Sequence, residues 1–294
     1  MSVANNPCWD VIRDVEPLEK IYDEALECLQ RNRPFLAVRV NDGESVYLNE
    51  LEDGRLLFDK MHFGGSRSLE DHKKLKELLI IAIQNADFIG GQVSQSFRNG
   101  TSCGPRYLIN HSIKKYMSPK ARLCNHSYHF ETSLNMLVDL VRAAKDIVLI
   151  STHNLRTRFC TVFNKDPSSV HILLIPGEHK FVKNRTNFKP LIWDRFHKVE
   201  HQIKNLASPG SLLLYGAGAG GKVFGAMFKA HGGVAIDLGS VMDLWNGRVT
   251  RSKWARRQGG VSVAPLLQKQ FMNCSPREWM NEAKMASRLL KTKE

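Results

Sequence analysis

Two acidic residues follow the first apolar strand that the sequence predicts, and their spacing could bind a metal ion. The segment FLAVRVNDGE, residues 35–44, runs from an apolar stretch into Asp42 and Glu44. In an extended segment residues i and i+2 point the same way, so these carboxylates would converge on one point. Paired carboxylates suit a hard divalent cation, Mn²⁺ or Mg²⁺, that also binds substrate phosphates. The alternative is a hairpin turn, because Asn-Asp-Gly is a good turn sequence by itself.

A second candidate site is a glycine-rich turn near the other end of the chain. In LLLYGAGAGGKVFGAMFKAHGGVAIDLG, residues 212–239, an apolar strand runs into the turn, a helix follows, and a second strand ends at Asp237. Glycines let the backbone approach a ligand, and a helix N-terminus attracts phosphate. The residues expected to bind a nucleotide-like or phosphate ligand are Gly216, Gly218, Gly220, Gly221, Lys222 and Asp237.

Taken alone, this turn also fits two other classes of enzyme. Its spacing satisfies G-x-G-x-x-G with an acid placed for a ribose hydroxyl, which is typical of NAD binding, and S-adenosylmethionine uses a similar turn. However, only 57 residues follow Asp237, and no clear strand is predicted among them. A further alternative is that the glycines only permit tight packing of the helix on the strand.

Both stretches together resemble the GT-D type glycosyltransferases, a family first catalogued as a domain of unknown function. The resemblance is carried by Arg39, Asp42, Gly43 and Glu44 in RVNDGE and by the strand, glycine turn, helix and strand of residues 212–239. It implies a Rossmann-like α/β fold, a nucleotide-sugar donor and a metal-dependent D-x-E motif on Asp42 and Glu44, with Arg39 and Gly43 beside the donor. Asn41 stands where the family has glycine, and Ser240 where histidine is expected.

Other polar residues follow predicted strands, where a parallel sheet binds its ligands. They are candidates for binding an acceptor or a phosphate, with packing or surface charge as the alternative: His126, His129, His153, Arg156 and Arg158. The sequence HKVEH, residues 197–201, matches the H-x-x-E-H pattern of some zinc proteases. We do not favour a protease, because the sequence announces no third ligand.

The charge of the chain is unevenly distributed and bears on its partners. The net charge is +13, yet residues 1–60 contain 7 Lys and Arg against 13 Asp and Glu, whereas the remaining 234 residues contain 35 against 16. The basic residues are densest in segments 180–189 and 248–257. Such segments attract phosphates, nucleic acid or an anionic membrane face, or they form a solvated surface.

Composition excludes several classes of protein. There is no apolar run of about 18 residues for a membrane span, and the N-terminal segment lacks the features of a signal peptide. The six cysteines are widely spaced, which indicates buried thiols in a reducing compartment and argues against disulfides and structural zinc. We therefore expect a cytoplasmic protein.

The elements that position these residues alternate along the chain. Strands are predicted near 35–40, 87–93, 121–125, 146–151, 170–176, 211–216 and 234–239. Helices are predicted near 17–30, 68–86, 105–116, 131–144, 156–163, 193–206, 222–231 and 276–290. Near-continuous apolar strands separated by helices favour an α/β fold with a mostly parallel sheet covered on both faces.

The expected domains are an N-terminal helical segment (1–34), a GT-D-like α/β domain (35–247) and a basic C-terminal helical extension (248–294). The favoured function is transfer of a hexosyl or pentosyl group from a nucleotide sugar, a UDP-sugar first. The acceptor would be a glycan, a glycoprotein or DNA with hydroxylated bases. The alternatives are an S-adenosylmethionine- or NAD-dependent enzyme and a non-catalytic nucleic-acid-binding protein.

Overall fold

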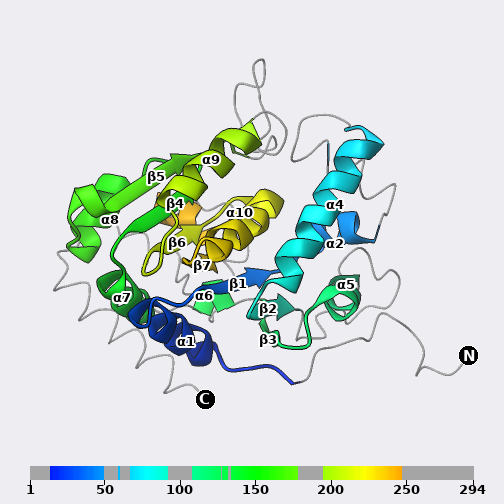
Figure 1. Ribbon diagram of the computed structural model, residues 1–294, viewed down its shortest axis with the longest axis horizontal. Coiled ribbons are helices and arrows are strands. Elements are labelled where there is room, and N and C mark those ends of the chain that lie inside the picture. The colour runs from blue at the N-terminus through cyan, green and yellow to red at the C-terminus, as the bar shows by residue number, and fades with distance from the viewer. Residues whose placement is uncertain are drawn as a thin grey trace, which may run out of the picture.

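The described part of the chain folds into a seven-stranded parallel sheet with helices on both faces (Figure 1). The structure is a computed structural model that describes residues 14–49, 59, 67–91, 108–126, 128–131, 134–177 and 195–246. The strand order is β3-β2-β1-β7-β6-β4-β5, and every pair of neighbouring strands is parallel. The fold class predicted from the alternating pattern is therefore confirmed.

The strands are short and apolar, as fully buried parallel strands are. Strands β1, β4, β6 and β7 are buried along their whole length. The bounds are β1 (Phe35–Arg39), β2 (Phe88–Gly91), β3 (Arg122–Asn125), β4 (Ile147–Ser151), β5 (Val170–Leu174), β6 (Leu212–Tyr215) and β7 (Val234–Asp237).

The helices lie between the strands along the chain. They are α1 (Leu18–Gln30), α2 (Asp42–Leu48), α4 (Leu69–Gln84), α5 (Leu108–Tyr116), α6 (Tyr128–Glu131), α7 (Leu134–Ala143), α8 (Arg156–Phe163), α9 (Phe196–Leu206), α10 (Gly218–Ala230) and α11 (Val241–Trp245), with the 3₁₀ helix η4 (Pro167–Ser169) before β5. None of the helices in the described ranges is both long and apolar enough to cross a bilayer.

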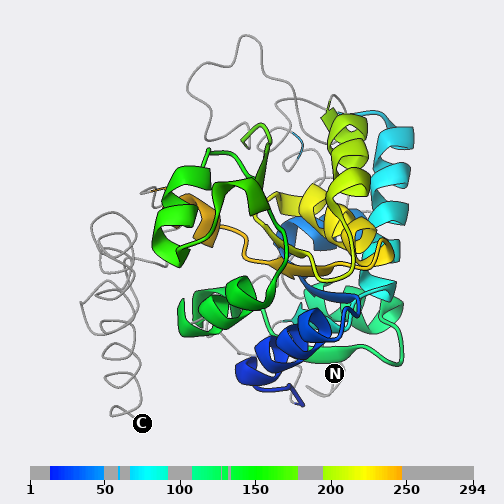
Figure 2. The same ribbon diagram turned by 60° about the vertical axis from the view of Figure 1, so that its left-hand side comes forward.

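Two apolar cores cover the two faces of the sheet. Helices α1, α7, α8 and α11 pack on one face, and α2, α4, α5, α9 and α10 pack on the other. In Figure 2, blue α1 and green α7 and α8 lie on one side of the sheet, whereas cyan α4 and yellow α9 and α10 lie on the other. Helix α10 contacts both α4 and α9.

Local sequence signals place most of these helices where they were predicted. Ser68 caps α4, because its Oγ accepts the N–H of Asp71 at 3.1 Å and the Asp71 carboxylate accepts the N–H of Ser68 at 3.4 Å. This reciprocal arrangement is a capping box. Helix α8 has the predicted bounds, and α10 begins four residues before the predicted start at Lys222. The helix predicted near 276–290 lies outside the described residues.

One element differs from the sequence prediction at a position that concerns function. The residues after β1 were expected to be extended or to form a hairpin turn, but Asp42–Leu48 is the helix α2. Asn41 supplies its N-cap, and Glu44 completes a capping box with the backbone N–H of Asn41 at 3.0 Å. The same Asn and acidic residues that suit a turn also start a helix, and the buried Val46, Tyr47 and Leu48 favour the helix by packing.

The chain leaves the two central strands in opposite directions. After β1 it enters α2, whose Tyr47 and Leu48 belong to the core with α4 and α10. After the neighbouring strand β7 it enters α11, whose Val241 and Trp245 belong to the core on the other face. In open α/β sheets, ligands bind outside the carboxyl ends of strands at such a switch point.

Candidate functional site

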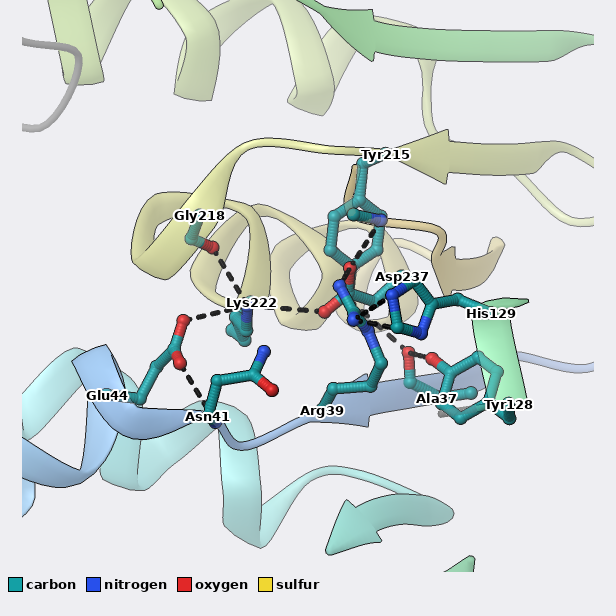
Figure 3. A network of polar contacts seen from close by, with 11 residues as sticks. Ala37, Arg39, Asn41, Glu44, Tyr128, His129, Tyr215, Gly218, Lys222 and Asp237 are labelled. Carbon is teal, nitrogen blue, oxygen red and sulfur yellow. Dashed lines mark hydrogen bonds and ion pairs between the residues drawn. The ribbon is translucent and has the colours of Figure 1, made fainter. Parts of the chain in front are cut away.

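Four charged side chains meet at the carboxyl ends of β1 and β7 (Figure 3). Arg39 ends β1 and donates from Nη2 to Oδ1 of Asp237, the last residue of β7, at 2.9 Å. Lys222 reaches in from α10, where its Nζ lies 2.8 Å from Glu44 Oε1 of α2 and 3.3 Å from Asp237 Oδ2. Residues nearly two hundred positions apart in sequence therefore form one network.

The network is almost wholly removed from solvent. Glu44 and Arg39 are 5% exposed, Lys222 is 3% exposed and Asp237 is 1% exposed. Burying charges is costly unless they are paired, and here two cations are matched by two carboxylates. The four charges therefore form a neutral cluster at the carboxyl ends of β1 and β7.

The pKa values of Lys222 and Asp237 keep these two groups ionised at neutral pH. Burial alone would lower the pKa of Lys222, but the charges of Asp237 and Glu44 outweigh it and raise that pKa. Burial would likewise raise the pKa of Asp237, but Arg39 and Lys222 hold it below its ordinary value. The pairing, and not the burial, decides the charge state.

His129 of α6 joins this network beside Arg39. The guanidinium Nη1 of Arg39 lies 2.7 Å from His129 Nε2 and 3.0 Å from Nδ1. Burial, and then the positive charge of Arg39, lower the pKa of His129 well below its ordinary value, so the imidazole is neutral. Sequence reasoning favoured a packing role for His126 and His129. An arginine at the end of an apolar strand is the sequence signal that could have found this contact, because a cation buried there needs polar partners.

Two buried tyrosines enclose Arg39 on the sheet side. Tyr128 and Tyr215 each donate to the carbonyl oxygen of Ala37 at 3.4 Å. Burial raises the pKa of both phenols well above the ordinary value, so both stay protonated. Neither tyrosine was singled out from sequence, because buried aromatic residues are common in any core.

The D-x-E motif is not arranged as predicted. Asp42 and Glu44 are the first and third residues of a helix, where positions two apart do not face each other. The prediction that an extended backbone points both carboxylates the same way is therefore wrong. The side chain of Asp42 lies outside the described part of the structure, whereas Gly43 is a buried residue of α2.

The glycines of the turn pack against the protein itself. A Cβ on Gly221 would lie 2.8 Å from the Tyr215 ring, and a Cβ on Gly216 would overlap the carbonyl oxygen of Gly239. Gly218 has φ +54°, and Gly220 is buried in the first turn of α10. The packing explanation thus accounts for Gly216 and Gly221, and Gly218 meets a backbone requirement.

The N-terminus of α10 is open in a way that the N-terminus of α2 is not. The first N–H groups of a helix lack partners within the helix. In α2 the Glu44 carboxylate accepts the N–H of the N-cap residue Asn41, whereas Ala217 at the N-cap of α10 has no polar side chain and makes no side-chain hydrogen bond. Gly218 at this end is exposed, and the buried Lys222 donates to its carbonyl oxygen at 3.1 Å.

The other candidate residues occupy different places. Arg156 is exposed on α8, and its Nε donates to the Pro167 carbonyl oxygen at 3.1 Å. Arg158 donates from Nη1 to the Trp245 carbonyl oxygen at 2.7 Å. His153 is half-buried in the turn after β4. The residues of the H-x-x-E-H pattern lie on α9, where His197 is exposed and contacts Glu200 at 3.2 Å.

A divalent ion does not fit between Glu44 and Asp237 in this arrangement. The ammonium of Lys222 already lies between their carboxylates, and Glu44 Oε2 accepts the N–H of Asn41. Within the described ranges, no three His, Cys, Asp or Glu side chains are grouped as metal ligands are. The predicted metal site on Asp42 and Glu44 stays a prediction, because it depends on a side chain that is not described.

Comparisons with known proteins give a distant structural likeness. No family model matches the chain, and no curated protein matches it either. Two solved structures cover 76% of this chain and 81% of theirs, each with a TM-score of 0.43, at 15% and 17% sequence identity. They are described as the domain of unknown function 1792, which has a distinct glycosyltransferase fold. This is the kind of protein that the sequence motifs resemble, but so distant a likeness assigns no function to the site.

Proposed function

We propose that this protein is a glycosyltransferase that binds the diphosphate of a nucleotide sugar at the N-terminus of α10. The observation that carries the proposal is the open end of α10 beside the charge network of Arg39, Glu44, Lys222 and Asp237. The end of α10 offers N–H groups without a side-chain cap, and it lies at the carboxyl edge of the sheet next to a buried cation. Anionic phosphate binds at helix ends of this kind.

The reaction would move a sugar from its diphosphate to an acceptor hydroxyl. The acceptor oxygen forms a bond to the anomeric carbon and gives up its proton to water or to the leaving group. The bond between the anomeric carbon and the diphosphate oxygen breaks, and negative charge develops on the leaving nucleoside diphosphate. The N–H groups of α10 and the fixed charges of Arg39 and Lys222 would stabilise that charge in a water-poor environment. Asp237 and His129 would hold Arg39 in place.

The finer points of the sequence prediction belong to this proposal as well. They include a hexosyl or pentosyl group, a UDP-sugar as donor, and a glycan, glycoprotein or hydroxylated-base DNA as acceptor. Cytoplasmic location is a further part of it. A Mn²⁺ or Mg²⁺ ion held by Asp42 and Glu44 is the alternative to the metal-free donor site that is argued below. The reading of Asp237 as a group that binds ribose hydroxyls is weakened by its contacts.

Those contacts also count against an NAD- or S-adenosylmethionine-dependent enzyme. In such enzymes the acid after the second strand accepts hydrogen bonds from ribose. Here Asp237 is 1% exposed, and Oδ1 already accepts Arg39 at 2.9 Å and the Gly239 N–H at 3.0 Å. Its other oxygen is paired with Lys222.

A thermal-shift panel tests the proposal against these alternatives. UDP-, GDP- and CDP-sugars, with and without Mn²⁺, are compared with S-adenosylmethionine and NAD. We expect at least one nucleotide sugar to raise the melting temperature, because a ligand that binds only the folded state stabilises it. Stabilisation by NAD or S-adenosylmethionine alone would contradict the proposal. DNA affinity without any effect of nucleotide sugars would indicate a non-catalytic binding protein.

A further inference from the structure

The carboxylates of the site are already bonded to groups of the protein. Oxygen Oε1 of Glu44 contacts Lys222 at 2.8 Å, and Oε2 accepts the Asn41 N–H at 3.0 Å. Oxygen Oδ1 of Asp237 accepts from Arg39 and from the Gly239 N–H, whereas Oδ2 makes no hydrogen bond and lies 3.3 Å from the Lys222 ammonium as an ion pair. A metal ion would have to displace these donors.

The charge of the cluster also disfavours a metal ion at these two carboxylates. Two carboxylates are balanced by two buried cations, so a divalent ion would add two positive charges to a neutral site. It would lie beside an ammonium in a region of low dielectric, where repulsion is strong.

The ammonium of Lys222 lies between the carboxylates of Glu44 and Asp237, where a divalent cation would otherwise bridge them. Its three contacts are Glu44, Asp237 and the carbonyl oxygen of Gly218, the first residue of α10. The charge is therefore within the first turn of the helix end that faces the expected diphosphate. A charge at this position acts on a bound anion without being its direct partner.

We propose that Lys222 takes the place of the divalent cation, so that the protein binds its diphosphate donor without metal. The inference rests on the proposed function. Lys222 is thus a positioning and charge-compensating residue, which holds Glu44 and Asp237 together and supplies positive potential to the open end of α10. A fixed ammonium needs no metal supply and no rearrangement when the donor arrives.

The first experiment uses the unmodified protein. Binding of UDP, GDP and CDP is measured by isothermal titration calorimetry in excess EDTA and again in excess Mn²⁺. We expect the same nucleotide to bind in both, with dissociation constants that differ by less than about threefold. Weakening by more than about tenfold in EDTA would overturn the metal-independent site while leaving the glycosyltransferase proposal intact. If none of the three binds under either condition, the proposed function itself fails.

The second experiment removes the ammonium. In Lys222→Ala the carboxylates of Glu44 and Asp237 lose their bridging cation, and we expect them to gain affinity for Mn²⁺. The probe is Mn²⁺ alone, followed by the loss of its free-ion electron paramagnetic resonance signal. Lys204→Ala on α9, whose ion pair with Glu200 is exposed, is the matched control.

The outcome separates a bridging lysine from a structural one. Mn²⁺ binding by Lys222→Ala that is lost again in Lys222→Ala/Glu44→Gln supports the proposal. Mn²⁺ binding by the wild type that Glu44→Gln abolishes would overturn it. If Lys222→Ala does not fold, the comparison of wild type with Glu44→Gln still decides the point.

Discussion

At the scale of single residues, the site depends on the pairing of buried charges. Arg39, Glu44, Lys222 and Asp237 are each at most 5% exposed. A buried ion pair adds little stability over an apolar pair, but loss of one partner leaves an uncompensated charge. The residues therefore depend on one another more than their separate contacts suggest.

This dependence predicts a strongly non-additive double mutant. Lys222→Met leaves Glu44 and Asp237 without their shared cation and should lower the free energy of unfolding by about 3–5 kcal/mol. Asp237 keeps its pair with Arg39 in this variant, and Glu44 is the carboxylate left without a cation. Adding Glu44→Gln removes that charge, so the double variant should be less destabilised than the sum of the single variants, by up to about 3 kcal/mol.

Urea denaturation of wild type, both single variants and the double variant measures this coupling. Lys204→Met serves as the control, since an exposed pair contributes at most about 1 kcal/mol. Additive effects of Lys222→Met and Glu44→Gln would show that the two side chains are not coupled as the 2.8 Å contact indicates.

His129 predicts a specific dependence of stability on pH. The imidazole is neutral in the folded protein because its pKa is held well below the ordinary value of 6.5. Below that ordinary value the unfolded chain binds a proton that the folded protein does not. The free energy of unfolding should therefore fall as the pH falls below about 6.5, by about 1.4 kcal/mol per pH unit from this group.

Denaturation curves across this pH range test the assignment. In His129→Gln the slope below the ordinary histidine pKa should be smaller than in wild type. His111→Gln, at an exposed position on α5, is the control and should retain the wild-type slope. An unchanged slope in His129→Gln would mean that this imidazole is not the group that resists protonation.

At the scale of elements, the packing of helix α10 on strand β6 explains why Gly221 is a glycine. A Cβ on Gly221 would lie 2.8 Å from the ring of Tyr215. Gly221→Ala should therefore destabilise the protein by about 1–3 kcal/mol through overpacking. If Gly221 instead mattered through ligand contact, the variant would keep its stability and lose affinity for the nucleotide. Thermal melts with and without UDP distinguish these outcomes.

Helix α2 shows why part of the site could not be predicted from sequence. The alternation of strands and helices identified β1, β7 and α10, and the motifs identified Arg39, Glu44, Lys222 and Asp237 as candidates. The residue types of the segment Asn-Asp-Gly-Glu, residues 41–44, suit a turn and a helix N-terminus equally well. The choice is made by tertiary packing of Tyr47, whose hydroxyl donates to the buried Asp59 at 2.5 Å, and such contacts are invisible in one sequence.

At the scale of the whole molecule, topology brings the two ends of the described chain together. Strand β1 pairs with β7 in the middle of the sheet. The segment 39–44 and the glycine-rich segment that ends at Asp237 therefore meet at the carboxyl ends of these strands. The pairing of Arg39 with Asp237, and the commitment of Asp237 to that pair, could not be predicted, because strand order is not encoded in local periodicity. The basic segments 180–189 and 248–257 lie outside the described residues.

The net charge of +13 predicts how an anionic acceptor would bind. If the acceptor is DNA, affinity measured by fluorescence anisotropy should fall by at least about tenfold between low and physiological salt, because counterions are released on binding. A neutral maltooligosaccharide is the control ligand, and salt should hardly affect its binding. DNA affinity that does not change with salt would contradict an electrostatic contact with this basic chain.

The central claim is that the open end of α10 and the neighbouring charges of Lys222 and Arg39 bind a diphosphate. A crystal structure of the protein with UDP, grown in EDTA, tests it most directly. We predict the diphosphate at the first turn of α10, with its oxygens on the N–H groups near Gly218 and with Lys222 still between Glu44 and Asp237. Diphosphate bound at another edge of the sheet, or at this edge only after a metal ion has displaced Lys222, would contradict the account.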